Sequence, residues 1–177
     1  MNNNSGPTYK IEQFLKHILA TLDTSYSPTS PQFNSPEAFQ NWILPQLNSQ
    51  SAIIINGSPY GSRSQFQEIW CNLPQTQHNL LSFDTHHVLS MPAQYVVVAH
   101  LKVRFDESGR TRKGDSSELI NNNNASNVNK RPIYGPWFGV CLNLVFSEAI
   151  LESFDVECIS SFNWRITEKP ENSIYNI

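Results

Sequence analysis

The stretch Ile133-Tyr-Gly-Pro-Trp-Phe-Gly-Val-Cys-Leu-Asn-Leu-Val-Phe146 decides the fold. Successive side chains of a β-strand point to opposite faces, so the even-numbered residues from Phe138 to Phe146 would make one wholly apolar face. The other face mixes apolar side chains with small and polar ones: Trp137, Gly139, Cys141, Asn143 and Val145. A single domain of this size has one core, which can cover only one of the two faces. We therefore interpret the mixed face as a surface that a second protein covers.

Two other segments repeat this two-faced pattern. From Gln94 to Phe105 the odd-numbered residues are all apolar, and the segment from Val156 to Thr167 has Phe162, Trp164 and Ile166 on one side. The residues of the opposite, half-polar side are Val96, Val98, His100, Lys102 and Arg104 in the first segment and Ser161, Asn163 and Arg165 in the second. Such a surface is too apolar for open solvent and too polar for a core, which is typical of a protein interface.

Three helices are expected before these strands. Apolar residues recur every three or four positions between Thr8 and Leu22, which predicts an amphipathic helix. Ser35-Pro36 begins a second helix with an apolar stripe from Phe39 to Leu47, and Ser62 begins a third, because serine can cap a first turn. Strands are expected at Ala52 to Asn56, Leu80 to Leu89, Gln94 to Phe105, Pro136 to Phe146 and Val156 to Thr167. The expected fold class is α+β, with three N-terminal helices on one face of a curved, mostly antiparallel sheet.

Length and composition indicate one folded unit. The 177 residues suffice for one substantial core, so we expect a single domain over residues 9–177 after a disordered N-terminus at residues 1–8. The net charge of -3 argues against a protein that grips nucleic acid with its whole surface. No apolar run reaches the roughly 18 residues that span a bilayer, so we expect an intracellular protein without a membrane segment. Cys71, Cys141 and Cys158 lack metal-binding spacing and are expected to be buried thiols, with no disulfide and no metal site.

An unusually long connection, from Glu107 to Tyr134, separates two of the expected strands. It is rich in asparagine and poor in apolar residues, so we expect a flexible insertion. Six basic and four acidic residues between Arg104 and Arg131 give this part of the chain +2, whereas the rest carries -5. The insertion is therefore either a solvated loop or a contact for RNA phosphates. The candidate contacts are Arg112, Lys113, Lys130 and Arg131.

A charged turn, Asp106-Glu107-Ser108-Gly109-Arg110, opens this insertion. Its glycine tolerates a backbone conformation that other residues avoid. Glu107 and Arg110 are therefore either a charged contact at the rim of a partner interface or ordinary turn residues.

Few residues suggest catalysis. His86 and His87 are neighbours on an expected strand, so they point to opposite faces and cannot hold one metal ion together. Asp84 and His86 share a face, as an acid and a base in an internal cavity would, which leaves a small-molecule isomerase or dehydratase as the alternative function. The segment from Gly57 to Ser62 lacks the Gly-Lys-Ser/Thr ending of a phosphate-binding loop and is interpreted as a turn and a helix cap. No cofactor is expected.

Several motifs together resemble one family. They are Lys102-Val-Arg-Phe-Asp-Glu-Ser-Gly-Arg110, the Asn-rich insertion, Tyr134-Gly-Pro-Trp-Phe-Gly139, Phe162-Asn163 and Lys169-Pro-Glu-Asn-Ser173. Over nearly the whole chain from Lys10, these motifs are similar to the fungal mRNA transport regulators, the small subunits of the fungal mRNA export receptor. The resemblance implies a nuclear transport factor 2-like cone, in which the helices pack against a curved sheet.

The resemblance also implies a non-enzymatic adaptor of the nucleus and the nuclear pore that shuttles to the cytoplasm. The adaptor would pair sheet to sheet with the nuclear transport factor 2-like domain of the large mRNA export factor, as a near-obligate heterodimer. The heterodimer would bind Phe-Gly nucleoporins transiently and carry mRNA and large ribosomal subunits, with RNA or pre-ribosome contacts in the loop from Thr111 to Arg131. The expected partner interface comprises Val96, Val98, His100, Lys102, Arg104, Trp137, Cys141, Asn143, Val145, Ser161, Asn163 and Arg165.

Overall fold

A computed structural model of the chain describes residues 6–114 and 132–175. The helices in this part of the chain are α1 Pro7–Leu22, α2 Pro36–Trp42 and α3 Arg63–Cys71, and a short 3-10 helix η1 spans Glu148–Leu151. The strands are β1 Leu47–Ile55, β2 Ser58–Tyr60, β3 Thr76–Val88, β4 Gln94–Phe105, β5 Phe138–Ser147 and β6 Ile159–Glu168.

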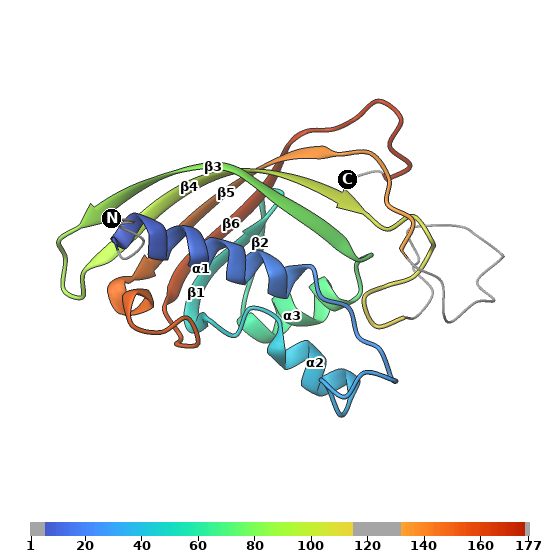
Figure 1. The fold of residues 1–177 in the computed structure, drawn as a ribbon, viewed down its shortest axis with the longest axis horizontal. Helices are drawn as coiled ribbons and strands as arrows, with labels where there is room; N and C mark the ends of the chain where they lie inside the picture. Colours follow the sequence, from blue (N-terminus) through green and yellow to red (C-terminus); the bar gives the residue numbers. More distant parts are fainter. Residues whose placement is uncertain (1–5, 115–131, 176–177) are drawn as a thin grey trace, which may run out of the picture.

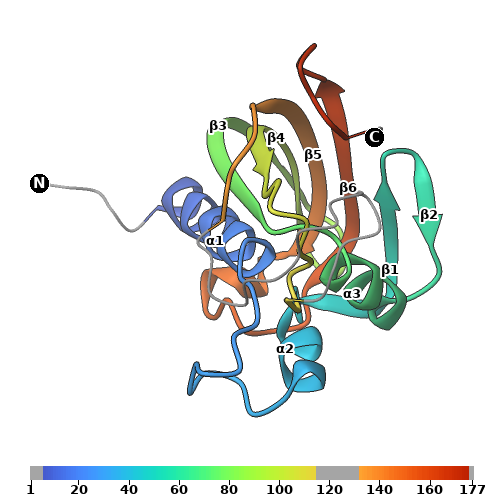
Figure 2. The same ribbon diagram turned by 90° about the vertical axis from the view of Figure 1, so that its right-hand side faces the viewer.

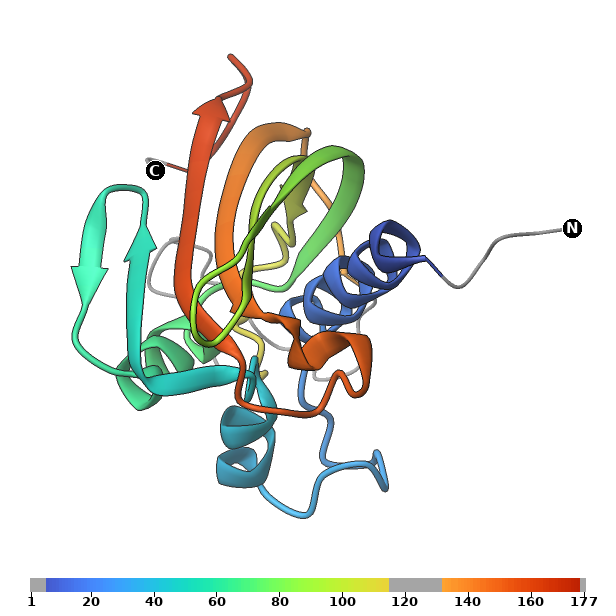
Figure 3. The same ribbon diagram turned by 90° about the vertical axis from the view of Figure 1, so that its left-hand side faces the viewer.

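The strands form one curved sheet in the order β2-β1-β6-β5-β4-β3. Neighbouring strands are antiparallel except β1 and β6, which are parallel. Figure 1 shows β3 to β6 arching over α1, with α2 and α3 on the same side of the sheet as α1. Figures 2 and 3 show the curvature from the two ends, with the β1–β2 hairpin at the far edge from β3. The expected α+β class, with helices on one face of a curved and mostly antiparallel sheet, is confirmed.

Aromatic side chains fill the space between the helices and the sheet. Every residue of the apolar stripe predicted for α1 is buried. The ring of Phe14 meets the ring of Phe146 edge-on, with centroids 5.0 Å apart. From α3, the ring of Phe66 lies 5.6 Å from Phe162, and the Trp70 ring lies near Trp164. These contacts explain why the inner residues of the sheet are apolar, because each one replaces water with ring or methyl groups.

The two ends of the helical region differ from the sequence-based prediction. α1 begins at Pro7, since proline suits a first helical turn, so Pro7 and Thr8 do not belong to a disordered N-terminus. α2 ends at Trp42, and Leu47, which the helical spacing predicts on the apolar stripe of α2, is the first residue of β1. Its side chain remains in the core, but it reaches the core from a strand.

The segment after β1 also differs, because Ser58–Tyr60 is a strand and not part of a turn. Asn56 and Gly57 close a tight hairpin with positive φ angles of 49° and 83°. Two residues in this left-handed conformation match the twist of the flanking strands, which is why Asn-Gly favours hairpins. The predicted cap of α3 is confirmed, since the Ser62 hydroxyl accepts a hydrogen bond from the Gln65 amide at 3.2 Å.

Candidate functional site: the outer face of the sheet

The site is the face of β3 to β6 that is turned away from the helices, which we call the outer face. Strand register brings the predicted residues into rows across it. Val98 of β4 pairs with Asn143 of β5, which pairs in turn with Asn163 of β6. The neighbouring rows are Val96, Val145 and Ser161, and His100, Cys141 and Arg165. All twelve residues of the predicted interface are at least partly exposed, so the sequence pattern correctly assigned the two faces.

The outer face leaves apolar side chains in contact with solvent. Val96 is 37% exposed, Val98 36% and Trp137 38%, although β-branched and aromatic side chains are usually covered. The described part of the chain places no helix over them, because α1, α2 and α3 all lie on the other side of the sheet. An exposed, partly apolar face of this kind is typical of a protein interaction site.

A shallow depression lies toward the middle of the outer face. It has a volume of about 410 Å³ and is lined by Cys141, Asn143, Asn163, Arg165, Ile166 and Thr167. Arg165 is exposed there and makes no ion pair with any residue that the structure describes. The depression thus offers amide groups and one cationic fork to a side chain that enters it.

A stacked cluster lies at one end of the outer face. The guanidinium carbon of Arg104 lies 4.8 Å from the centre of the Tyr134 ring and 4.7 Å from the centre of the Trp137 ring. Its Nε donates a hydrogen bond to Gln77 Oε1 at 2.7 Å, which fixes the plane of the guanidinium. Arginine and aromatic side chains held rigidly in this way are frequent anchors of interfaces, since little rotamer entropy is lost on binding.

Sequence reasoning missed two contributions to this face. Ala52 and Ile54 of β1 pair with Ser161 and Asn163 of β6 and extend the outer face beyond β6. Asp84 and His86 of β3 pair with Val98 and Val96 and extend it at the opposite edge.

The position of Asp84 and His86 overturns the cavity hypothesis. Both side chains are exposed on the outer face, whereas an internal catalytic pocket would require them to point toward the helices. The interior below them is occupied by the aromatic core. The isomerase or dehydratase that relied on these two residues is therefore excluded in this form.

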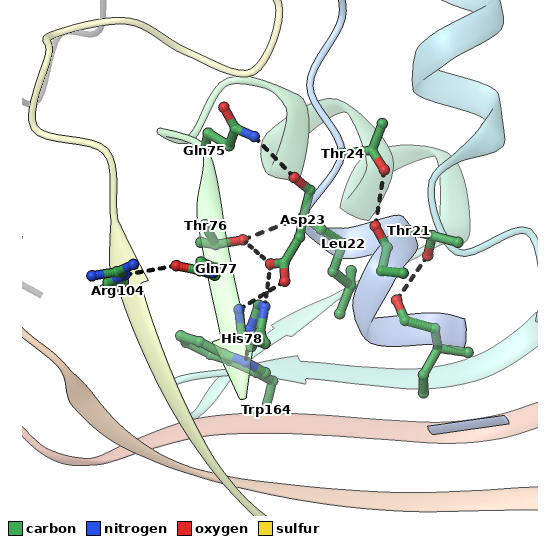
Figure 4. A network of polar contacts seen from close by, with 12 residues as sticks. Thr21, Leu22, Asp23, Thr24, Gln75, Thr76, Gln77, His78, Arg104 and Trp164 are labelled. Carbon is green, nitrogen blue, oxygen red and sulfur yellow. Dashed lines mark hydrogen bonds and ion pairs between the residues drawn. The ribbon is translucent and has the colours of Figure 1, made fainter. Parts of the chain in front are cut away.

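A buried polar network lies under the outer face, between α1 and the sheet (Figure 4). Asp23 accepts hydrogen bonds from the Thr76 hydroxyl at 2.8 Å and from the His78 amide at 2.7 Å, and His78 Nδ1 lies 2.5 Å from it. Trp164 Nε1 donates to His78 Nε2 at 3.2 Å. Because indole nitrogen can only donate, Nε2 is the acceptor and Nδ1 carries the proton toward Asp23. The network ties the end of α1 to β3 and β6.

Arg112 belongs to this buried region, which corrects its assignment as an RNA contact. Its side chain is fully buried. It donates to four backbone carbonyls and to the Thr76 hydroxyl, at 2.6 to 3.3 Å; the carbonyls belong to Leu22, Trp70, Leu73 and Pro74. Burial lowers the pKa of Arg112 to about 10. A guanidinium enclosed in this way cannot reach a phosphate, and it acts instead as a structural link between α1, α3 and β3.

Of the other candidate RNA contacts, the structure describes Lys113 alone. Lys113 is partly exposed and donates from Nζ to Gln40 Oε1 at 2.9 Å. Lys130 and Arg131 lie outside the described residues.

Both ends of the insertion are ordered, contrary to the expectation of flexibility over the whole range 107–134. The buried Asp106 carboxylate accepts from the Ser108 amide at 3.0 Å and from the Ile133 amide at 2.8 Å. The Glu107 amide donates to the Ile133 carbonyl at 2.7 Å. Gly109 has a φ of 83°, as the charged turn requires. Glu107 and Arg110 are half-buried, so they are not a freely exposed charged turn.

The remaining features concern metal ligands, membrane-spanning helices and cysteines. Within residues 6–114 and 132–175, no three His, Cys, Asp or Glu side chains gather in a way that would hold a metal ion. No helix in the same ranges is long and apolar enough to cross a membrane. All three cysteines are free thiols; Cys71 and Cys158 are buried as expected, whereas Cys141 is partly exposed on the outer face.

The chain is similar to known transport proteins over nearly its whole length. The family described as "Nuclear pore RNA shuttling protein Mtr2" matches residues 5–177. The mRNA transport regulator MTR2 of Candida albicans is 40% identical over 98% of this chain and 99% of the relative. The mRNA transport regulator MTR2 of Saccharomyces cerevisiae is 34% identical over 99% of this chain and 95% of the relative.

Solved structures agree with this similarity. The crystal structure of the Candida albicans Mtr2-Mex67 M domain complex matches with a TM-score of 0.78 and 39% identity, and covers 94% of this chain and 99% of that chain. Nuclear transport factor 2 of Cryptosporidium parvum matches with a TM-score of 0.53 at 12% identity, over 94% of this chain and 98% of that chain. At this low identity the second match shows the fold alone, which is the nuclear transport factor 2-like fold that the sequence predicted.

Proposed function

Because the chain belongs to the Mtr2 family of nuclear pore RNA shuttling proteins, we propose that it is the small subunit of an mRNA export heterodimer and binds its large partner through the outer face. The partner is the M domain of a Mex67-type export factor, as in the solved complex of the Candida albicans relative. The proposal rests above all on one observation: β4 and β5 carry a half-apolar face that no helix of the described residues covers.

Sheet-to-sheet pairing accounts for the residues on this face. Val96, Val98 and Val145 supply apolar area, while Asn143 and Asn163 supply hydrogen-bonding groups at the centre. Arg165 supplies an exposed charge that a carboxylate of the partner would satisfy. A stable heterodimer of this kind buries on the order of 2,000 Å² in total. The twelve residues of the predicted interface, together with Ala52 and Ile54, supply this chain's side of the contact.

Charge placed in the centre of the outer face tests the proposal. Asn143→Arg and Val145→Asp should each weaken binding to the Mex67 M domain of the same organism by about 100-fold or more, since a buried unpaired charge costs several kcal/mol. Asn34→Arg, at an exposed position on the helical side, is the matched control and should bind like the unmodified chain. Sedimentation velocity of equimolar mixtures measures the complex. Pairing of both outer-face variants at the affinity of the unmodified chain would show that another surface binds the partner.

The same proposal extends to cargo and to the nuclear pore. The heterodimer carries mRNA and large ribosomal subunits from the nucleus, contacts Phe-Gly nucleoporins weakly enough for rapid release, and returns from the cytoplasm. In this chain the remaining candidates for RNA or pre-ribosome contact are Lys113, Lys130 and Arg131, because Arg112 is enclosed by the core. The charged residues Glu107 and Arg110 directly precede the loop from Thr111 to Arg131 in the sequence.

A further inference from the structure

The loop between α1 and α2, residues 23–35, contains a cluster of Ser-Pro dipeptides that partner binding does not explain. They are Ser27-Pro28, Ser30-Pro31 and Ser35-Pro36, and a fourth, Ser58-Pro59, lies in β2. Proline-directed protein kinases recognise serine or threonine followed by proline. Proline also fixes its own backbone and keeps the preceding residue extended, so the dipeptide presents the serine in an open conformation.

Contacts of two residues, Tyr26 and Phe33, anchor this loop and leave its middle raised. The Tyr26 amide donates to the Arg112 carbonyl at 2.8 Å, which holds one end against the core. Phe33 is buried and packs edge-on against Phe39 at 5.3 Å and against Trp42 at 5.2 Å, which holds the other end. Between these anchors the chain forms a turn, in which the Ser30 amide donates to the Ser27 carbonyl at 3.0 Å. The two serine hydroxyls make only local contacts: Ser27 Oγ lies 3.0 Å from Thr29 Oγ1, and Ser30 Oγ accepts from the Gln32 amide at 3.3 Å.

The raised part of the loop is accessible. Pro28, Thr29, Pro31 and Gln32 are exposed, the two serines between and beside them, Ser27 and Ser30, are half-buried, and no helix or strand includes residues 24–35. Figure 1 and Figure 2 show the loop projecting on the helical side of the molecule, away from the outer face of the sheet. It therefore stays open to solvent when a partner covers the outer face.

The other two Ser-Pro dipeptides are held in regular structure. The Ser35 hydroxyl accepts from the Ala38 amide at 3.1 Å as the cap of α2, and Pro36 is already the first residue of that helix. A kinase would have to unwind the first turn to bind this dipeptide in an extended form. Ser58 is paired with Ile55 in the β1–β2 hairpin, and it is exposed but not free to leave the sheet.

We propose that Ser27 and Ser30 are phosphorylation sites for a proline-directed serine/threonine kinase. The serine oxygen attacks the γ-phosphorus of ATP and a new oxygen–phosphorus bond forms. The bond between the γ-phosphorus and the oxygen that bridges to the β-phosphate breaks, and ADP leaves. The hydroxyl proton passes to the catalytic base of the kinase. Each phosphate adds about -1.5 to -2 charges near neutral pH.

The phosphates would change the charge of the helical side without touching the outer face. The segment that contains Lys113 runs beside Tyr26, since the preceding residue accepts the Tyr26 amide. A phosphate on Ser27 therefore enters the neighbourhood of the Lys113 ammonium, which now bonds Gln40. Charge-assisted pairing of this kind orders a loop. The modified and unmodified forms should bind the partner equally well.

Phosphorylation of the full chain by a purified cyclin-dependent kinase with ATP, followed by mass spectrometry of peptides against time, tests the proposal. The initial rates at Ser27 and Ser30 should exceed the rate at Ser35 by about tenfold, the ratio that a helix cap worth roughly 1.4 kcal/mol sets. They should also exceed the rate at Ser58, which is held in the β1–β2 hairpin. Pro28→Ala and Pro31→Ala should each remove the phosphate from the preceding serine. The heat-unfolded chain is the control, and in it the serines of the four Ser-Pro dipeptides should react at similar rates.

Two results would overturn the proposal. One is equal rates at the serines of all four Ser-Pro dipeptides in the folded chain, because the loop would then not determine which serines are phosphorylated. The other is the absence of phosphate from Ser27 and Ser30 while the unfolded chain is modified there. Peptide mapping of the protein purified from its own cells then shows whether the same two serines carry phosphate in growing cells, and unmodified peptides under all growth conditions would also refute the assignment.

Discussion

The guanidinium carbon of Arg112 lies 4.7 Å from the centre of the Trp70 ring, and both side chains are buried. A residue at the beginning of the insertion is therefore part of the core. It donates to carbonyls at the ends of α1 and α3, where a helix leaves its last carbonyls open. It shares them with the Trp70 indole, which donates to the Leu22 carbonyl, and with the Leu73 amide, which donates to the Trp70 carbonyl. The insertion is thus joined to the fold by a buried charge at one end and by the Asp106 carboxylate at the other.

Arg112→Met should lower the free energy of unfolding by about 2 to 4 kcal/mol, since the Pro74 carbonyl and the Thr76 hydroxyl lose a charged donor that methionine cannot replace. The carbonyls of Leu22, Trp70 and Leu73 each keep a second donor. Chemical denaturation followed by circular dichroism measures the change. Lys113→Met is the neighbouring control, and it should stay within about 0.5 to 1 kcal/mol because Lys113 is partly exposed. Similar midpoints for the two variants would mean that the buried guanidinium contributes no more than its neighbour.

Trp164→Phe should cost about 1 to 3 kcal/mol, because His78 Nε2 loses its donor while the aromatic packing is largely retained. The His78 side chain is enclosed, so water cannot easily replace the indole. Trp42→Phe serves as the control, since no hydrogen bond from its indole occurs among the described residues. A loss that is equal in both variants would assign the effect to ring size and not to the hydrogen bond.

The sequence predicted local features well and distant contacts poorly. The alternation in β4 and β5 identified both faces, because the period of two is set by the strand itself. Arg112 gave no such signal, since it lies among polar residues and its partners Leu22 and Trp70 are 90 and 42 residues away. The outer-face role of Ala52 was hidden for the same reason, because it depends on a parallel pairing of β1 with β6.

The residues of the outer face show the same difference between local features and distant contacts. Asn143 and Val145 could be assigned to the outer face from one strand alone, whereas the cluster of Arg104 with Tyr134 and Trp137 needs the register of β4 against the residues before β5. Leu47 was placed on a helix because its spacing from Phe39 continued the helical period. The structure turns the chain at Leu44, which has a φ of 48°, so the period ends before Leu47.

The chain should lose stability between pH 9 and pH 10. Burial raises the pKa of the Cys71 thiol from 9.0 to about 11 and that of Cys158 to about 12. The unfolded chain then releases these protons at lower pH than the folded chain, so the free energy of unfolding falls as the pH rises through this window. Each thiol should contribute roughly 1 kcal/mol. The titration of Arg112 has the opposite effect and raises the free energy of unfolding as the pH rises, but only above its lowered pKa of about 10.

Urea denaturation at pH 8, 9 and 10 measures this dependence. The double variant Cys71→Ala, Cys158→Ala should be less stable at every pH and should also show a much flatter dependence between pH 9 and 10. The slope is the informative quantity, because a cavity left by the missing sulfur lowers stability equally at all pH values. An unchanged slope in the double variant would place the alkaline transition on other groups.

Replacing Lys130 and Arg131 with serine should weaken RNA binding by the heterodimer and reduce its dependence on salt. Two phosphate contacts on single-stranded RNA correspond to a change of about 1.4 in the slope of log K against log salt concentration. Lys16→Ser combined with Lys10→Ser removes the same charge from α1 and is the matched control. Filter binding between about 50 and 200 mM salt measures both slopes. If the α1 variant lost as much slope as the Lys130 and Arg131 variant, total charge and not the insertion would determine RNA affinity.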